Sequence, residues 1–258
     1  MDDSSETPAK KHLEHIEDER LTVIRHDDNE GVSSARNTAI EASKGKYLAF
    51  LDDDDVWLED KIQKQVNFLE NQKDSVKGCY TGSIVESEKG SEKVIPRHHS
   101  DLQYQILMMN ARGAFGSTLM VSKSAVLEVG NFKEDMERNE DWELLVRFLD
   151  EYELLPIQEP LIIRDIGRKN VEPEKTEKIK NKFLKEVEEP LEDLNWVERR
   201  KVYSTHYLQL SWLFSWDKKK IKAAQYLLIA MLYHPIPKKR AIGRSIYYLV
   251  IPSRYHPT

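Results

Sequence analysis

Residues 31–57 read GVSSARNTAIEASKGKYLAFLDDDDVW, and this stretch predicts a helix, a strand and an acidic turn in succession. A serine at position 33 or 34 can begin the helix, and Gly45 stands just past its end, where glycine is common. Residues 46–51 are nearly all apolar and lie between a glycine and an aspartate, which predicts a buried parallel strand. Residues 52–55, four consecutive aspartates, then stand at the carboxyl end of that strand.

Such an acidic run has two interpretations. Adjacent carboxylates repel one another and raise each other's pKa unless a cation compensates them. Ligands of doubly wound sheets bind beyond the carboxyl ends of strands, and Mg²⁺ or Mn²⁺ uses carboxylate and phosphate oxygens. An Asp-X-Asp there can hold the metal with one carboxylate and a ribose hydroxyl with the other. The alternative is a solvated turn that caps the next helix, but the preceding apolar strand favours the metal site.

The chain up to about residue 165 predicts alternating strands and helices. Strands are predicted at residues 21–25, 76–85, 117–122 and 153–164. Helices are predicted at residues 10–19, 58–72, 101–109, 124–130 and 142–150. Two prolines in the last strand indicate an edge position or a kink, and the alternating order is typical of the α/β class. Beyond about residue 170 the segments are helical, which predicts two domains, a catalytic one at 1–168 and a helical region at 169–258.

Composition excludes some classes of function. The chain has 258 residues and a formal net charge of -6, which argues against nucleic acid as a partner. Its single cysteine, Cys79, cannot form an internal disulfide, which indicates a reducing compartment and a packing role for the thiol. No apolar run approaches the ~20 residues that span a bilayer, and the first residues lack a signal-peptide core. The sequence therefore predicts a cytoplasmic protein.

The order of motifs in residues 31–57 closely resembles the inverting family 2 glycosyltransferases, which have the GT-A fold. The residues that carry the match are Gly31, Ala35, Arg36, Asn37, Ala39, Gly45, Tyr47, Phe50, Leu51, Asp52, Asp54 and Asp55. The resemblance implies a Rossmann-like mixed sheet flanked by helices, with a C-terminal helical extension. It also implies sugar transfer from a nucleotide diphosphate sugar to an acceptor hydroxyl, assisted by Mg²⁺ or Mn²⁺, in glycan, polysaccharide or glycolipid synthesis.

The same resemblance assigns the donor side of the site. Asp2 and Asp3 look like the family's V-D-D-x-S segment, in which the second aspartate contacts the nucleotide base. Without the downstream match, the first residues would be interpreted as a disordered acidic terminus. The predicted donor-binding residues are Asp2, Asp3, Arg36, Asp52 (on the ribose) and Asp53, the predicted metal ligand is Asp54, and Arg147 is a candidate phosphate contact.

The acceptor side follows from a second match. Inverting transfer needs a carboxylate that deprotonates the acceptor hydroxyl. The segment Glu140-Asp141-Trp142 precedes an amphipathic helix and resembles the family's base-carrying segment, so Asp141 is the predicted base and its two neighbours shape the pocket. Gly116 and Ser117 fall where the family's small-residue turn lines the acceptor site. The alternatives are a helix N-cap for Asp141, a plain tight turn at Gly116 and Ser117, and a packing role for Trp142.

One departure from the family concerns the start of the chain. Family members carry a first strand and helix ahead of the V-D-D-x-S segment, whereas Met1 stands where that strand should end. The sequence therefore predicts an N-terminally incomplete catalytic domain. The alternative hypothesis is a non-catalytic, truncated relative that serves as a binding or partner protein.

The C-terminal region combines basic and apolar residues. Lysines occupy positions 218–220, and further basic residues follow at 238–240 and 244, beside leucines and aromatic residues. Helices of this kind can lie on anionic membrane surfaces, which would suit a lipid-linked acceptor at the inner face of the membrane. A solvated helix face is the simpler interpretation.

Overall fold

The computed structural model describes residues 1–87, 90–96, 101–111, 113, 116–165 and 172–234. Its chain forms two compact units, one of residues 1–102 and 112–167 and the other of residues 103–111 and 168–258. The sequence-based division, 1–168 and 169–258, assigned residues 103–111 to the catalytic domain, whereas this short segment clusters with the C-terminal helices in the structure.

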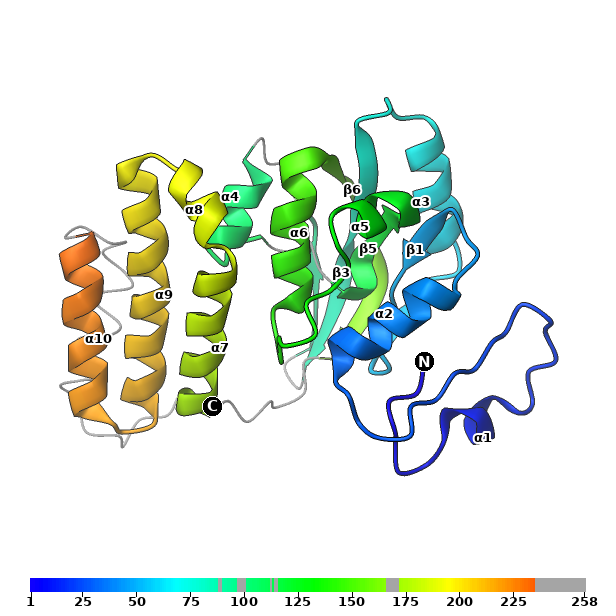
Figure 1. Ribbon diagram of the computed structural model, residues 1–258, viewed down its shortest axis with the longest axis horizontal. Coiled ribbons are helices and arrows are strands. Elements are labelled where there is room, and N and C mark those ends of the chain that lie inside the picture. Colours follow the sequence, from blue (N-terminus) through cyan, green and yellow to red (C-terminus); the bar gives the residue numbers. More distant parts are fainter. Residues whose placement is uncertain (88–89, 97–100, 112, 114–115, 166–171, 235–258) are drawn as a thin grey trace. The chain divides into compact units, whose positions relative to one another are not determined.

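The first unit is built on a mixed sheet (Figure 1). Its strands are β1 (Tyr47–Ala49), β2 (Asp55–Trp57), β3 (Val76–Ser87), β4 (Gly90–Val94), β5 (Leu119–Ser122) and β6 (Glu153–Asp165). They lie in the order β1-β5-β3-β6-β2, with β4 paired to β3. The β3–β6 pair is parallel and the other named pairs are antiparallel. The predicted α/β class is thus confirmed.

Helices α1 (Ala9–Leu13), α2 (Val32–Ala42), α3 (Lys61–Glu70), α5 (Lys123–Glu128) and α6 (Glu140–Glu151) complete this unit. The apolar face of α3 packs on the sheet, where Leu69 joins Val76, Cys79 and Met120 in one core cluster. Cys79 is fully buried, as expected of a packing thiol, and burial raises its pKa to about 12. The helix predicted at residues 10–19 is shorter than expected, because it ends at Leu13.

Two strand predictions need correction. β1 is only three residues long and pairs antiparallel with β5, so the predicted parallel strand at 46–51 is wrong. The inference assumed burial on both faces, but Tyr47 and Ala49 are half-buried and Leu51 is 51% exposed. Residues 21–25 form no strand, and a single parallel bridge joins Asp2 to Arg25.

The two prolines of β6 indicated an edge position or a kink, and the edge position is wrong, because β6 lies between β3 and β2. Because β2 pairs only with Ile162 to Arg164, Pro156 and Pro160 lie outside the part of β6 that is bonded on both sides. The register of the β3 pairing also shifts at Gly82, opposite Pro160. A bulge of this kind accommodates a residue that cannot donate a ladder hydrogen bond.

Within its described residues, the second unit is helical, as predicted. It contains α7 (Pro173–Glu186), α8 (Glu188–Asp193), α9 (Trp196–Trp216) and α10 (Lys220–Tyr233), and α4 (Leu102–Leu107) contributes most of its residues to it. Helices α9 and α10 lie side by side (Figure 1) and bury Leu208, Leu227 and Ala230 between them. Among the described residues, no helix combines the length and the apolar character needed to cross a membrane.

Candidate active site

The acidic turn connects β1 to β2 and closes on itself, because the amide of Asp55 donates to the carbonyl of Asp52 (3.1 Å). Its four aspartates are not equivalent. Asp53 and Asp54 are exposed, Asp52 is half-buried, and Asp55, the first residue of β2, is only 9% exposed. One carboxylate oxygen each from Asp52, Asp54 and Asp55 lie within 4.8 Å of one another, whereas Asp53 is not in this group.

These three carboxylates form a donor set that suits a hard divalent cation. Mg²⁺ and Mn²⁺ prefer oxygen ligands, and both leave coordination positions for phosphate oxygens. Burial raises the pKa of Asp55, with Asp52 and Asp54 adding to the rise, while Ser117 and Arg164 act against it. A bound cation would relieve this repulsion. The sequence assigned metal binding to Asp54 alone, although the D-x-D-D spacing already offered Asp55 as a signal.

Arg36 of α2 joins the acidic turn to the start of α6. Its Nη2 donates to Oδ1 of Asp52 (3.0 Å) and its Nη1 to Oε1 of Glu140 (2.7 Å). The guanidinium also contacts the rings of Phe50 and Phe132, at 5.9 and 5.4 Å from their centroids. Its side chain is only 14% exposed. Because both carboxylates are held by one planar group, their orientations are coupled.

Asn37, which follows Arg36 in the family match, fastens α2 to the loop before α6. Its Nδ2 donates to the carbonyl of Phe132 (2.9 Å), and its Oδ1 accepts from the amide of the same residue (3.0 Å). Nδ2 also lies 3.1 Å from Oε1 of Glu134. This two-way bond to the backbone holds the loop before α6 against α2, and therefore helps to set where Glu140 meets Arg36.

The turn at Gly116 and Ser117 packs directly on the acidic turn. Ser117 is buried, and its Oγ accepts from the amide of Asp52 (3.0 Å). Gly116 has a φ of 42°, and a Cβ added to it would lie 3.1 Å from Oδ2 of Asp52. Both the left-handed backbone and the close carboxylate therefore favour glycine at this position. The predicted role of this turn in lining an acceptor site stays a prediction.

Asp141 lies inside the first turn of α6. The helix begins at Glu140, and its cap position is Asn139, which has a φ of 62°. Oδ1 of Asp141 accepts from the amide of Trp142 (2.8 Å), which is one residue further along the chain. The alternative interpretation of Asp141 as the N-cap is therefore wrong. Trp142 is half-buried and Glu140 is buried against Arg36.

The surroundings of Asp141 favour its protonated form. Burial and the neighbouring carboxylate of Glu140 raise its pKa to about 7, with a further contribution from Asp52, although Arg36 and the amide of Trp142 act in the opposite direction. A carboxyl group with a pKa near neutrality is matched to accepting a proton at physiological pH. Strongly perturbed carboxyl groups also concentrate at functional sites.

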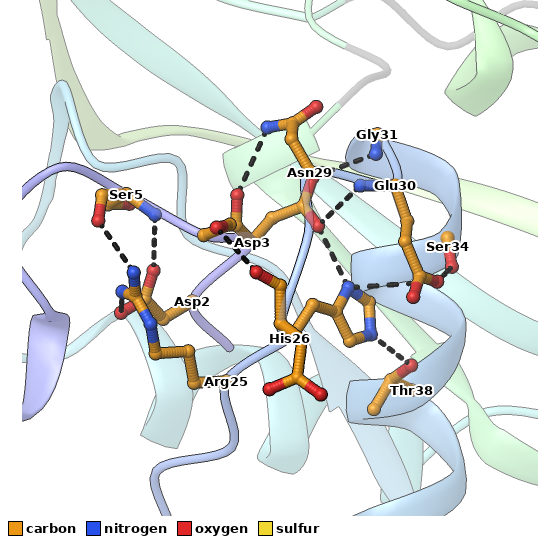
Figure 2. Close-up of polar contacts among 12 residues, drawn as sticks. Asp2, Asp3, Ser5, Arg25, His26, Asn29, Glu30, Gly31, Ser34 and Thr38 are labelled. Carbon is orange, nitrogen blue, oxygen red and sulfur yellow. Dashed lines mark hydrogen bonds and ion pairs between the residues drawn. The ribbon is translucent and has the colours of Figure 1, made fainter.

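Asp2 is enclosed by donors from its own chain (Figure 2). Its carboxylate accepts from the amides of Ser5 (2.9 Å) and Ala9 (2.8 Å) and from the guanidinium of Arg25 (2.5 Å). These bonds, led by that from Ser5, hold its pKa far below the ordinary value. Asp2 is 3% exposed, so its carboxylate organises the first residues of the chain.

Asp3 organises the loop that enters α2 (Figure 2). Its oxygens accept from the amides of Glu30 (3.0 Å) and Gly31 (2.8 Å), and Nδ1 of His26 lies 2.8 Å away. The other ring nitrogen of His26 bonds to the hydroxyl of Thr38 on α2 (3.0 Å). Burial acts to raise the pKa of Asp3, but these bonds outweigh it and lower the pKa. The sequence did not single out His26.

Arg147 is used within the fold. It donates through Nε and Nη2 to the carboxylate of Glu143 (2.7 Å each) and also to the carbonyls of Val129 and Asn131. These bonds tie α6 to the loop after α5. They engage the guanidinium within the fold and give no support to the predicted phosphate contact.

Comparison with known sequences decides the family. The sequence model described as glycosyl transferase family 2 matches residues 1–130, which include both N-terminal aspartates, Arg36 and the acidic turn. The chain belongs to glycosyl transferase family 2. Asp141 and the rest of α6 lie beyond the matched residues.

Two curated relatives show the extent of the similarity. The Escherichia coli UDP-Glc:alpha-D-GlcNAc-diphosphoundecaprenol beta-1,3-glucosyltransferase WfaP is 40% identical over 72 residues, which are 28% of this chain and 29% of WfaP. An uncharacterized glycosyltransferase of Haemophilus influenzae is 30% identical over 146 residues, 55% of this chain and 49% of that protein. The chain thus spans about half or less of the length of these relatives.

Solved structures show the fold. The structure of S. aureus TarS residues 1–349 in complex with UDP-GlcNAc matches 94% of this chain and 73% of its own, with a TM-score of 0.63 and 15% identity. The same protein in complex with UDP matches with a TM-score of 0.59 and 14% identity. The prediction of a GT-A fold with a C-terminal helical region is confirmed.

Proposed function

We propose that this chain is an inverting glycosyltransferase that moves a sugar from a nucleotide diphosphate sugar to an acceptor hydroxyl in glycan, polysaccharide or glycolipid synthesis. One observation carries the proposal. Arg36 bonds to Asp52 in the carboxylate cluster and to Glu140 beside Asp141, so the metal and diphosphate side and the base side meet at one guanidinium. Family membership and the nucleotide sugar named with TarS support the same class of donor.

Each proposed role follows from the chemistry of the group. A Mg²⁺ or Mn²⁺ ion held by Asp54, Asp55 and Asp52 would neutralise the leaving diphosphate. Asp52, oriented by Arg36, also meets the ribose, and the exposed Asp53 is a further proposed donor contact. Asp141 accepts the proton of the attacking hydroxyl, and its burial together with Glu140 keeps the pKa of that carboxyl group high. Asp3 remains the proposed contact to the nucleotide base of the donor, and Asp2 supports the segment that carries Asp3.

The proposed function predicts donor turnover that depends on a metal ion. A panel of UDP and GDP sugars is incubated with the protein and Mn²⁺, and free nucleoside diphosphate is measured. We expect nucleoside diphosphate to be released from at least one donor. EDTA should lower the release rate about 10²-fold or more, because it removes the ion that would neutralise the leaving diphosphate. Absence of both turnover and Mn²⁺-dependent nucleotide binding would favour the non-catalytic relative.

We further propose a glycan or lipid-linked acceptor and a peripheral position at the cytoplasmic face of a membrane, with no nucleic acid partner. The acceptor named for WfaP carries a polyprenyl lipid, which supports this class. On α10, Ile221, Leu228 and Leu232 are 80%, 63% and 74% exposed, and their spacing of seven and four residues puts them on one face. Residues 218–234 contain four lysines and no acidic residue, which suits an anionic lipid surface.

The basic residues 238–240 and 244 that were also predicted to contribute lie outside the described residues. Within the described part of the chain, two of the α10-region lysines are engaged elsewhere. Lys219 pairs with Glu174 (2.7 Å), and Lys222 pairs with Glu177 (2.7 Å). The membrane proposal therefore rests on the apolar face of α10 more than on its charges.

The triple variant Ile221→Ser, Leu228→Ser, Leu232→Ser should lose about tenfold in binding to phosphatidylglycerol vesicles, because three exposed apolar side chains no longer enter the interface. Co-sedimentation measures the partition, with phosphatidylcholine vesicles as the neutral comparison. Leu127→Ser, an exposed leucine of α5, is the matched control and should bind as the wild type does. Unchanged sedimentation of the triple variant would contradict the proposed contact.

A further inference from the structure

Lys61, the first residue of α3, is fully buried. Its Nζ lies 2.6 Å from Oε1 of Gln65 and 4.3 Å from the centroid of the Trp57 ring. Within the described part of the chain, these two groups, and no carboxylate, meet its charge. Burial lowers the pKa of Lys61 to about 8. A buried cation with so little compensation is costly, and such costs are typically retained where they serve function.

Both partners of Lys61 bond to the same turn. Nε1 of Trp57 donates to the carbonyl of Ser117 (3.0 Å), and Nε2 of Gln65 donates to the carbonyl of Thr118 (3.0 Å). These are consecutive residues of the turn that packs on the acidic run. Oγ of Ser117 in turn accepts from the amide of Asp52. Two short paths thus lead from one buried ammonium to this turn, and Ser117 carries them to a proposed donor-binding residue.

The ammonium dictates how both partners point. Lysine can only donate, so Gln65 must turn its oxygen toward Lys61, which leaves its NH₂ for the carbonyl of Thr118. If the amide of Gln65 were reversed, its oxygen would face the carbonyl oxygen of Thr118, and no hydrogen bond could form. The cation over the indole face similarly favours one ring plane, and that plane aims Nε1 at Ser117. A neutral side chain in place of Lys61 would exert neither constraint.

We propose that Lys61 is a positioning residue that presets the acidic turn through Trp57, Gln65 and the 116–118 turn. Its effect on donor binding rests on the proposed function, because it acts through Asp52. Its effect on the geometry of the turn does not. The two effects can therefore be measured apart.

The test compares Lys61→Met, which has similar length and no charge, with Lys61→Arg and with Lys64→Met, a half-buried lysine of the same helix that is paired with Asp60 and Glu159. Hydrogen exchange of peptides covering residues 51–58 and 116–119 reads the turn directly. In Lys61→Met we expect exchange there to rise about tenfold, because the amide of Asp52 loses a fixed acceptor. The unfolding midpoint should not fall, because the costly buried charge is removed. Lys61→Arg should return exchange to within about twofold of the wild type, and Lys64→Met should not change it.

Nucleotide binding is the second readout, with UDP and Mn²⁺ titrated by calorimetry. Lys61→Met should raise the dissociation constant about fivefold, because the carboxylates must be ordered on binding. Wild-type exchange at residues 51–58 in Lys61→Met would overturn the positioning role. Increased exchange in a protein whose wild type binds neither UDP nor GDP would instead sink the proposed function and leave the positioning role standing.

Should Lys61→Met fail to fold, Trp57→Phe answers the same question. It keeps an aromatic ring under the ammonium and removes only the Nε1 donor to Ser117. Faster exchange at residues 51–58 in Trp57→Phe is the expected result. Wild-type exchange in that variant would overturn the Trp57 path and, with it, the proposal.

Discussion

The Asp141→Asn protein is expected to bind UDP and Mn²⁺ as the wild type does while losing about 10²–10⁴-fold in transfer rate. Asparagine has nearly the shape of aspartate but cannot accept the proton of the attacking hydroxyl. Asp141 is not in the carboxylate cluster of the acidic turn, so the metal and donor contacts should persist. Nucleotide titration and initial transfer rates measure the two effects separately.

Glu151→Gln is the matched control, since it neutralises an exposed carboxylate on the same helix, far along from Asp141. This variant should keep wild-type rates. Full transfer activity in Asp141→Asn would show that the base lies elsewhere. Loss of UDP binding together with transfer would assign Asp141 to the donor side.

The raised pKa of Asp141 gives this prediction a pH dependence. A base must be deprotonated, so kcat/KM of the wild type should rise as the pH increases through about 7. Stability should move the other way. The folded state holds the Asp141 proton above the pH at which the unfolded chain releases it, so this contribution is present at low pH and is lost as the pH rises through about 7. As the pH rises from the value at which the unfolded chain releases this proton to about 7, the unfolding midpoint of Asp141→Asn should therefore fall less than that of the wild type.

Arg36→Met is expected to give the second large effect, a loss of stability on the order of 3 kcal/mol together with weakened nucleotide binding. The substitution leaves the buried carboxylate of Glu140 without its partner and frees Asp52 to rotate. Arg36 also lowers the pKa of Asp141, so any remaining activity should require a higher pH than the wild type does. Chemical denaturation, UDP titration and the pH profile measure the three consequences.

The double variant Arg36→Met, Glu140→Gln separates the stability effect from the binding effect. It removes the uncompensated charge of Glu140, so much of the lost stability should return. UDP binding should stay weak, because Asp52 still lacks its guanidinium. Arg20→Met is the control, as Arg20 is 91% exposed and pairs only with Asp18 within the described residues. Wild-type UDP affinity in the double variant would contradict a role for Arg36 in orienting the donor side.

Local patterns were enough for much of the fold. Residues a few positions apart are enough to reveal the apolar spacing of α3 and α6, the glycine after α2 and the change to a charged, helical composition near residue 170. The failures were non-local. Whether β1 pairs parallel or antiparallel depends on β5, more than seventy residues away (Tyr47 pairs with Ser122). The prolines of β6 are tolerated because β2 is short, which no pattern within β6 reveals.

The sequence by itself determined the family motif, the acidic run at a strand end and the carboxylate pair at the start of α6. These are features of residue order, and they named Arg36, Asp52 and Asp141 before any fold was known. Only the tertiary structure decided that Arg36 spans Asp52 and Glu140, that Asp55 joins the carboxylate cluster while Asp53 does not, and that Gly116 lies against the carboxylate of Asp52. The reason is physical: the direction of a side chain, and the charge it meets, depend on elements brought together from distant parts of the chain.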